Sequence, residues 1–112
     1  MKRIIILVAT ISWALLIWRL TTSAQIMVTN EHWLQNILMM GAHFTFFGIQ
    51  AVLLRLSLST PLSLTIASLY GFIIELVQRT VPGRSADPLD WILDTLGAVI
   101  FLSIMKKYSK SI

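Results

Sequence analysis

Residues 75–97 read ELVQRTVPGRSADPLDWILDTLG and join two long apolar segments. This stretch holds four of the chain's five acidic residues, on either side of a Pro82-Gly83-Arg84 turn. A carboxylate at the centre of a membrane-spanning helix costs about 2.5–3.5 kcal/mol, so such residues are rare and face a protein interior or a wet cavity. The stretch therefore predicts two spanning helices that bring acidic side chains together near a polar turn.

The composition is that of an integral membrane protein, because 56% of the 112 residues are hydrophobic and 12% are charged. Apolar runs of spanning length predict an all-α bundle of transmembrane helices. The predicted spans are four, at about residues 4–20, 37–56, 61–78 and 88–105, in a single domain over residues 1–112. The segment 21–36 is predicted to be an external loop, with room for a short interfacial helix at Glu31 to Trp33.

The first apolar run has a second interpretation. Its basic start, its apolar core and the small residues Thr22-Ser23-Ala24 also fit a signal peptide and its cleavage site. We favour a first spanning helix over this alternative. The absence of cysteine excludes disulfides, thiol catalysis and thiolate metal sites.

The distribution of basic residues predicts the orientation of the bundle. Spans at these positions divide the nine basic residues six to three. The larger group is Lys2, Arg3, Arg55, Lys106, Lys107 and Lys110, and the smaller is Arg19, Arg79 and Arg84. The positive-inside rule then places both termini in the cytoplasm and the turn at Arg84 outside. Because basic patches with interleaved aromatic residues do not occur, we expect no nucleic-acid partner.

Residues three and four apart share one face of a helix, and this spacing predicts the packing faces. Small residues that let helices approach closely are expected to line such faces. The predicted faces are Ser63, Ala67, Gly71 and Glu75 in the third span, Asp87, Asp90, Asp94 and Gly97 in the fourth, and Gly41, Thr45 and Gly48 in the second.

These faces predict an outward-facing polar pocket that binds a ligand. Its candidate residues are His43, Glu75, Gln78, Arg84, Asp87, Asp90 and Asp94. Arg84 follows a rigid Pro-Gly turn, and its planar guanidinium suits carboxylate or phosphate groups. The alternative is a hydrogen-bonded network that only fixes helix register, with Arg84 paired to Glu75 or to an Asp. The spacing matches no metal-binding motif, so we expect neither a metal nor a cofactor, and no motif identifies a catalytic nucleophile.

The pattern Glu75-x-x-Gln78-x-x-x-Pro82-Gly83-Arg84, followed by Asp90-x-x-x-Asp94-x-x-Gly97, resembles the VanZ-like family of small bacterial membrane proteins. The similarity covers about residues 37–105 and includes His43 in the second span. Two departures stand out: Asp94 replaces the family's usual Asn, and Met39-Met40 replaces a basic residue. The resemblance implies a cell-envelope role, since a named member of the family is associated with low-level resistance to teicoplanin-type antibiotics.

Two functional hypotheses follow, and a purely structural helper subunit is a third. In the first, a multi-pass protein of the bacterial cell membrane binds an anionic or lipid-linked envelope ligand and affects glycopeptide susceptibility. In the second, the protein is a membrane enzyme that uses carboxylate or histidine acid–base chemistry on a lipid-linked phosphate or head group. The partner is in either case a membrane lipid or a lipid-linked ligand. We favour the first, because nothing in the sequence fixes a nucleophile.

Overall fold

A computed structural model describes residues 2–22, 30–81 and 88–111 of the chain. These residues form four α-helices and no strand: α1 (Lys2–Thr22), α2 (His32–Arg55), α3 (Thr60–Gln78) and α4 (Pro88–Ser111). Each helix is long and apolar enough to cross a membrane. The predicted all-α architecture with four spanning helices is therefore confirmed.

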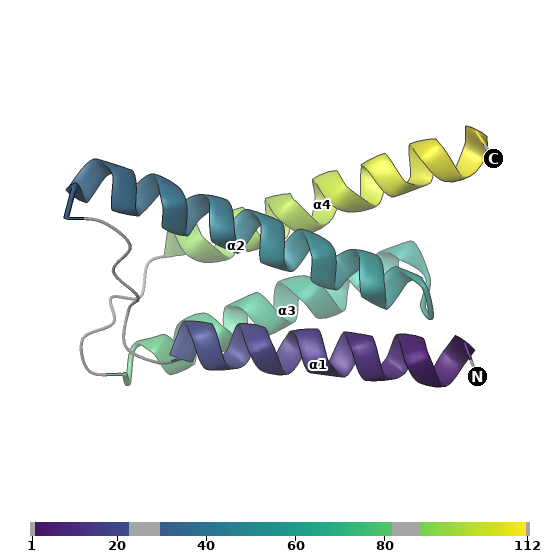
Figure 1. Cartoon of the computed structure of the whole chain (residues 1–112), viewed down its shortest axis with the longest axis horizontal. Coiled ribbons are helices and arrows are strands. Elements are labelled where there is room, and N and C mark those ends of the chain that lie inside the picture. Colours follow the sequence, from purple (N-terminus) through teal and green to yellow (C-terminus); the bar gives the residue numbers. More distant parts are fainter. Residues whose placement is uncertain (1, 23–29, 82–87, 112) are drawn as a thin grey trace.

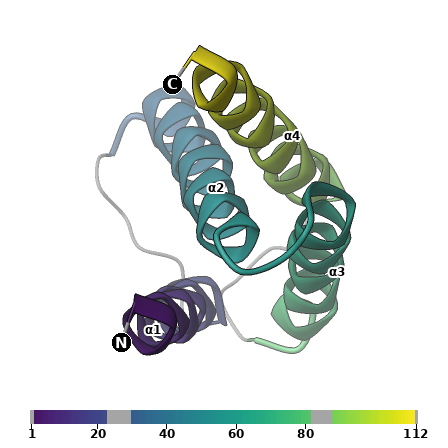
Figure 2. The same ribbon diagram turned by 90° about the vertical axis from the view of Figure 1, so that its right-hand side faces the viewer.

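The helices form an up-and-down bundle in which α1 and α3 run in one direction and α2 and α4 in the other (Figure 1). The start of α1 and the end of α4 lie at the same end of the bundle. Both α2 and α3 pack against all the other helices, whereas α1 and α4 lie on opposite sides of α2 (Figure 2). The end of α3 and the start of α4 therefore lie at the end of the bundle away from the termini.

Two boundaries differ from the sequence prediction. The loop predicted over residues 21–36 is wrong at its end, because α2 begins at His32 and absorbs the expected interfacial helix. The last helix continues to Ser111 instead of ending near residue 105. Hydropathy marks only the apolar part of a helix, and residues such as Lys106 and Lys107 favour helix in water as well.

The turn between α2 and α3 is fixed by local hydrogen bonds. The side chain of Ser59 caps α3 by accepting from the backbone N–H of Leu62 at 3.4 Å, and Pro61 occupies the first turn. Arg55 donates from Nε to Thr60 Oγ1 at 2.9 Å and from Nη1 to the carbonyl of Leu58 at 3.1 Å. This turn sets the antiparallel start of α3.

The small-residue face of α3 is confirmed, because Ser63, Ala67, Gly71 and Glu75 are all buried. The predicted packing face of α2 is confirmed at Gly48, which is buried, but is wrong at Gly41 and Thr45. Gly41 and Thr45 are exposed, and a Cβ at Gly41 would meet no atom within 4 Å among the described residues. The buried face of α2 instead carries His43, Phe47 and Gln50. Bulky and polar side chains occupy this face of α2 because the small residues that make room for them lie on the helices that face it.

Close contact between α2 and α4 depends on two glycines. A Cβ at Gly97 would collide with the backbone carbonyl of Phe44, and a Cβ at Gly48 would collide with the ring of Phe101. Beyond them, Ala51 and Ala98 are fully buried in an apolar cluster. Small residues thus bring the two backbones together, as is typical of helix pairs in membranes.

The first helix is attached to the bundle by hydrogen bonds at three levels. Trp13 Nε1 donates to the carbonyl of Phe46 at 2.9 Å, and the hydroxyl of Tyr70 donates to the carbonyl of Ala14. At the end of α1, Gln78 Nε2 donates to the carbonyl of Thr21 at 2.9 Å. The segment that also fits a signal peptide is therefore a packed helix of the bundle.

Candidate functional site

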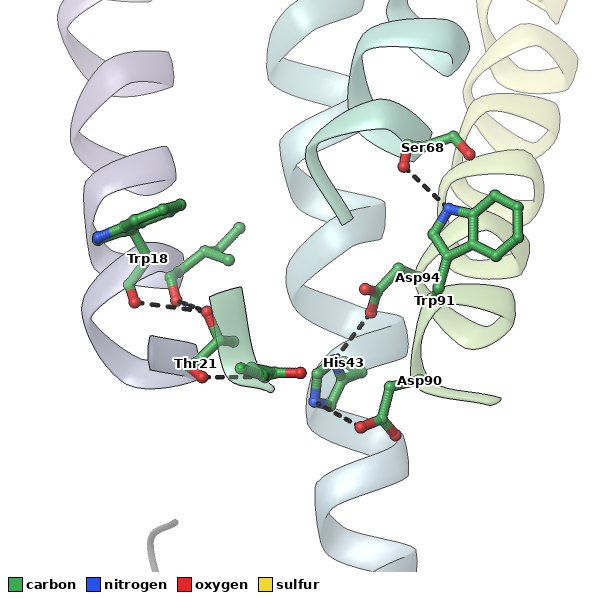
Figure 3. A network of polar contacts seen from close by, with 9 residues as sticks. Trp18, Thr21, His43, Ser68, Asp90, Trp91 and Asp94 are labelled. Carbon is green, nitrogen blue, oxygen red and sulfur yellow. Dashed lines mark hydrogen bonds and ion pairs between the residues drawn. The ribbon is translucent and has the colours of Figure 1, made fainter. Parts of the chain in front are cut away.

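His43 of α2 lies between two carboxylates of α4 (Figure 3). Its Nδ1 lies 2.9 Å from Asp94 Oδ1, which is a hydrogen bond, and its Nε2 lies 3.9 Å from Asp90 Oδ2. Asp90 and Asp94 are one helical turn apart, so both can face α2. The predicted convergence of these three residues is present in the structure.

The cluster is buried on one side and open on the other. The side chains of Asp94 and His43 are 2% and 6% exposed, whereas that of Asp90 is 25% exposed. A buried carboxylate loses its hydration and is stable only with hydrogen-bonding partners. The Nδ1–H of His43 is such a partner for Asp94, and Asp90 is the most exposed member of the cluster.

The third helix makes room for this cluster at Gly71. A Cβ at Gly71 would lie 2.9 Å from Asp94 Oδ2 and 3.2 Å from Asp94 Cβ. Distances this short force the neighbouring group to move. The glycine of the predicted small-residue face therefore allows the carboxylate of Asp94 to reach His43.

Glu75 lies one turn beyond Gly71 on the same face of α3 and is 4% exposed. Its Oε1 lies 3.3 Å from Nη2 of Arg79, and its charge acts on Asp94, as does that of Asp90. Gln78 is also buried, but its amide donates to α1 at Thr21. Glu75 thus belongs to the electrostatic environment of the cluster, whereas Gln78 helps to hold the bundle together.

Arg84 and Asp87 lie outside the described residues. The alternative of a purely structural network paired Arg84 with Glu75 or an Asp. Arg79, which is four residues after Glu75 and pairs with it, was overlooked. The i to i+4 spacing of opposite charges was a sufficient signal for this pair.

A second overlooked residue is Trp91, which sits between the two acidic residues of α4. Its Nε1 donates to the carbonyl of Ser68 at 3.0 Å, and the hydroxyls of Ser68 and Thr95 are 2.9 Å apart. These bonds join α4 to α3 on the flank of the cluster, and Figure 3 shows the one between Trp91 and Ser68. Trp91 therefore helps to position Asp90 and Asp94.

This arrangement suits hydrogen bonding to a ligand and proton transfer. Carboxylate oxygens accept hydrogen bonds, and a histidine fixed at Nδ1 by a carboxylate presents Nε2 as a donor or an acceptor. Within the described parts of the chain, no group of His, Cys, Asp and Glu side chains is arranged to hold a metal ion.

Comparison with protein families matches residues 4–108 to the VanZ/LLP1 family model. No curated protein and no solved structure matches the chain. The family match includes α2 and α3 entirely, most of α1 and α4, and every residue of the cluster around His43. With its four apolar helices, the chain is a multi-pass membrane protein that belongs to the VanZ/LLP1 family.

Proposed function

We propose that this protein binds the polar head group of a lipid-linked envelope ligand at the outer face of the bacterial cell membrane. The observation that carries the proposal is the buried His43–Asp94 hydrogen bond with the partly exposed Asp90 beside it. Ionisable groups inside a membrane bundle are costly and mark functional sites by default. These groups lie at one level of two adjacent helices, α2 and α4. This arrangement suits a head group that enters from the end of the bundle.

The chemistry of the cluster indicates which part of the ligand it would contact. Acidic side chains predominate around His43, so this region is suited to hydrogen-bond donors such as hydroxyl, amide or ammonium groups. A phosphate or carboxylate in the ligand would need a positively charged partner. Arg79 is 59% exposed and lies at the end of α3 that carries Glu75. We therefore propose a ligand with a donor-rich head group, whose phosphate or carboxylate faces Arg79.

Such binding would affect susceptibility to teicoplanin-type antibiotics, the property associated with the family. The test compares Asp90→Asn with Glu31→Gln, which removes a carboxylate outside the cluster. We expect Asp90→Asn to abolish the effect on teicoplanin susceptibility at unchanged protein level, and Glu31→Gln to retain it. Native mass spectrometry of both proteins extracted from their own membrane should show a bound lipid lost only from Asp90→Asn. Equal susceptibility and equal lipid content in the two variants would contradict the proposal.

A second candidate function, an acid–base enzyme, is favoured by one specific observation. The Nδ1 contact with Asp94 fixes the orientation of the His43 ring, which is what a histidine general base requires. Incubation of the purified protein with envelope lipids distinguishes the two functions. Phosphate release or an altered lipid that disappears in His43→Gln would establish the enzyme, whereas bound but unaltered lipid would support the binding protein.

A further inference from the structure

A groove of about 580 Å³ lies between α1 and α3, away from the cluster around His43. Its volume is in the range of small-molecule sites, which is about 300–1,000 Å³. The walls are apolar side chains of the two helices, chiefly Ile11, Leu15, Trp18, Ile66, Leu69 and Ile73. Since α1 and α3 are both membrane-spanning, this groove opens toward lipid.

The groove also contains a polar atom without a hydrogen-bond partner in the described part of the chain. Gln50 of α2 lines the groove, is 4% exposed, and its Oε1 has no hydrogen-bond partner among the described residues. An unpaired amide oxygen buried in this way costs about 1–3 kcal/mol. Gln50 is five residues from Arg55 and seven from His43, or roughly 7 and 10 Å along the helix. The amide therefore lies within the apolar length of the bundle.

The groove is separate from the His43 cluster. His43, Phe47 and Gln50 follow one another on one face of α2, so Phe47 lies between the two sites. Phe47 and Ile17 are fully buried, and Ile74 is 1% exposed, so these three form an apolar partition. A ligand of the groove thus contacts Gln50 without contacting His43.

We propose that this groove binds a hydroxyl-bearing membrane lipid, with its hydrocarbon chain between α1 and α3 and its hydroxyl on the Gln50 amide. A saturated chain would fill the apolar walls but leave the amide unpaired. A half-turn about the last side-chain bond of Gln50 exchanges the positions of the amide oxygen and the amide nitrogen. A hydroxyl both donates and accepts, so it pairs with either end of the amide.

The test uses a photoreactive long-chain alcohol and the full-length protein in phosphatidylcholine vesicles. We expect crosslinks to peptides containing residues 11–18 and 66–73. An unlabelled alcohol should compete more strongly than an alkane of equal length, by about 2- to 10-fold, the contribution of one net hydrogen bond. Gln50→Leu should remove this difference, because it keeps the apolar volume and deletes the amide.

A matched pair of variants tests the position. Ala14 lines the groove and Ala9 is an exposed residue of the same helix that does not, so Ala14→Phe should suppress labelling and Ala9→Phe should not. Equal labelling of these two variants would overturn the proposal. So would equal competition by alcohol and alkane on the wild type, or a difference that persists in Gln50→Leu. The comparison in Gln50→Leu stands even if Ala14→Phe weakens the docking of α1.

Discussion

Gly71 on α3 faces the carboxylate of Asp94 on α4, and a Cβ at Gly71 would lie 2.9 Å from Asp94 Oδ2. The absence of a side chain at Gly71 thus leaves room for the charged carboxylate of Asp94. Asp94 in turn hydrogen-bonds His43 on α2, so three helices meet at this contact.

The first prediction concerns this contact. Gly71→Ala should destabilise the protein by about 1–3 kcal/mol through overpacking, and Gly71→Leu should lower the folded yield in detergent further. Gly41→Ala is the matched control, because a Cβ there would meet nothing within 4 Å among the described residues. Thermal unfolding in detergent measures the difference. If Gly71→Ala and Gly41→Ala melt together, the close approach of α3 to Asp94 is wrong.

The second prediction concerns the buried pair. His43→Ala leaves Asp94 without its hydrogen-bond donor, which should cost about 3–5 kcal/mol if the carboxylate stays charged. Adding Asp94→Asn to His43→Ala should recover most of this loss, because it removes the charge. Asp94→Asn alone restores the family's usual residue and should be tolerated. Chemical unfolding of the four proteins forms a double-mutant cycle. Strictly additive effects would mean that the two side chains do not interact.

The third prediction tests the ion pair of Glu75 with Arg79. Arg79→Ala should destabilise the protein by less than the roughly 3–5 kcal/mol of a fully buried pair, since Arg79 is largely exposed. Glu75→Gln should rescue Arg79→Ala, because a neutral amide is cheaper to bury than an unpaired carboxylate. A double variant that is less stable than Arg79→Ala would show that Glu75 has another essential partner.

The fourth prediction ranks two glycines of the α2–α4 contact. A Cβ at Gly97 collides with the backbone of α2, whereas a Cβ at Gly48 collides with the Phe101 ring. A ring can rotate but a helix backbone cannot shift cheaply, so Gly97→Ala should lower the melting temperature more than Gly48→Ala. Gly48→Ala combined with Phe101→Leu should recover stability, and Gly97→Ala has no such rescue. The reverse ranking would place the closest backbone contact at Gly48.

The fifth prediction is the orientation in the membrane. Ser57 and Thr80 are exposed residues at opposite ends of α3. The six-to-three distribution of basic residues predicts that Thr80→Cys, but not Ser57→Cys, reacts with an impermeant thiol reagent on intact cells. Both should react after permeabilisation, which controls for accessibility. Labelling of Ser57→Cys alone on intact cells would invert the topology.

The sequence was sufficient to predict the number of spanning helices and the packing face of α3. The length of an apolar run and the four-residue spacing of small residues are properties of one segment of sequence. They do not depend on how the helices pack together. The packing face of α2 was predicted correctly only at Gly48, because small residues such as Gly41 are equally acceptable to lipid and to a neighbouring helix. Only the facing surfaces of α3 and α4 determine that His43 and Phe47 turn inward. Similarly, the convergence of His43 with Asp94 was predictable from residue type, whereas the role of Trp91 depends on a backbone carbonyl that sequence does not reveal.

The attachment of α1 has a consequence for how its sequence can vary. Two of the hydrogen bonds described above end on main-chain carbonyls of α1, at Ala14 and Thr21, and their donors belong to α3. A main-chain carbonyl is present whatever the side chain is, so the retention of these bonds depends on the donors Tyr70 and Gln78. Apolar residues of α1 that face lipid can therefore change during evolution without detaching the helix. The residues of α3 that donate to α1 cannot change without losing these bonds.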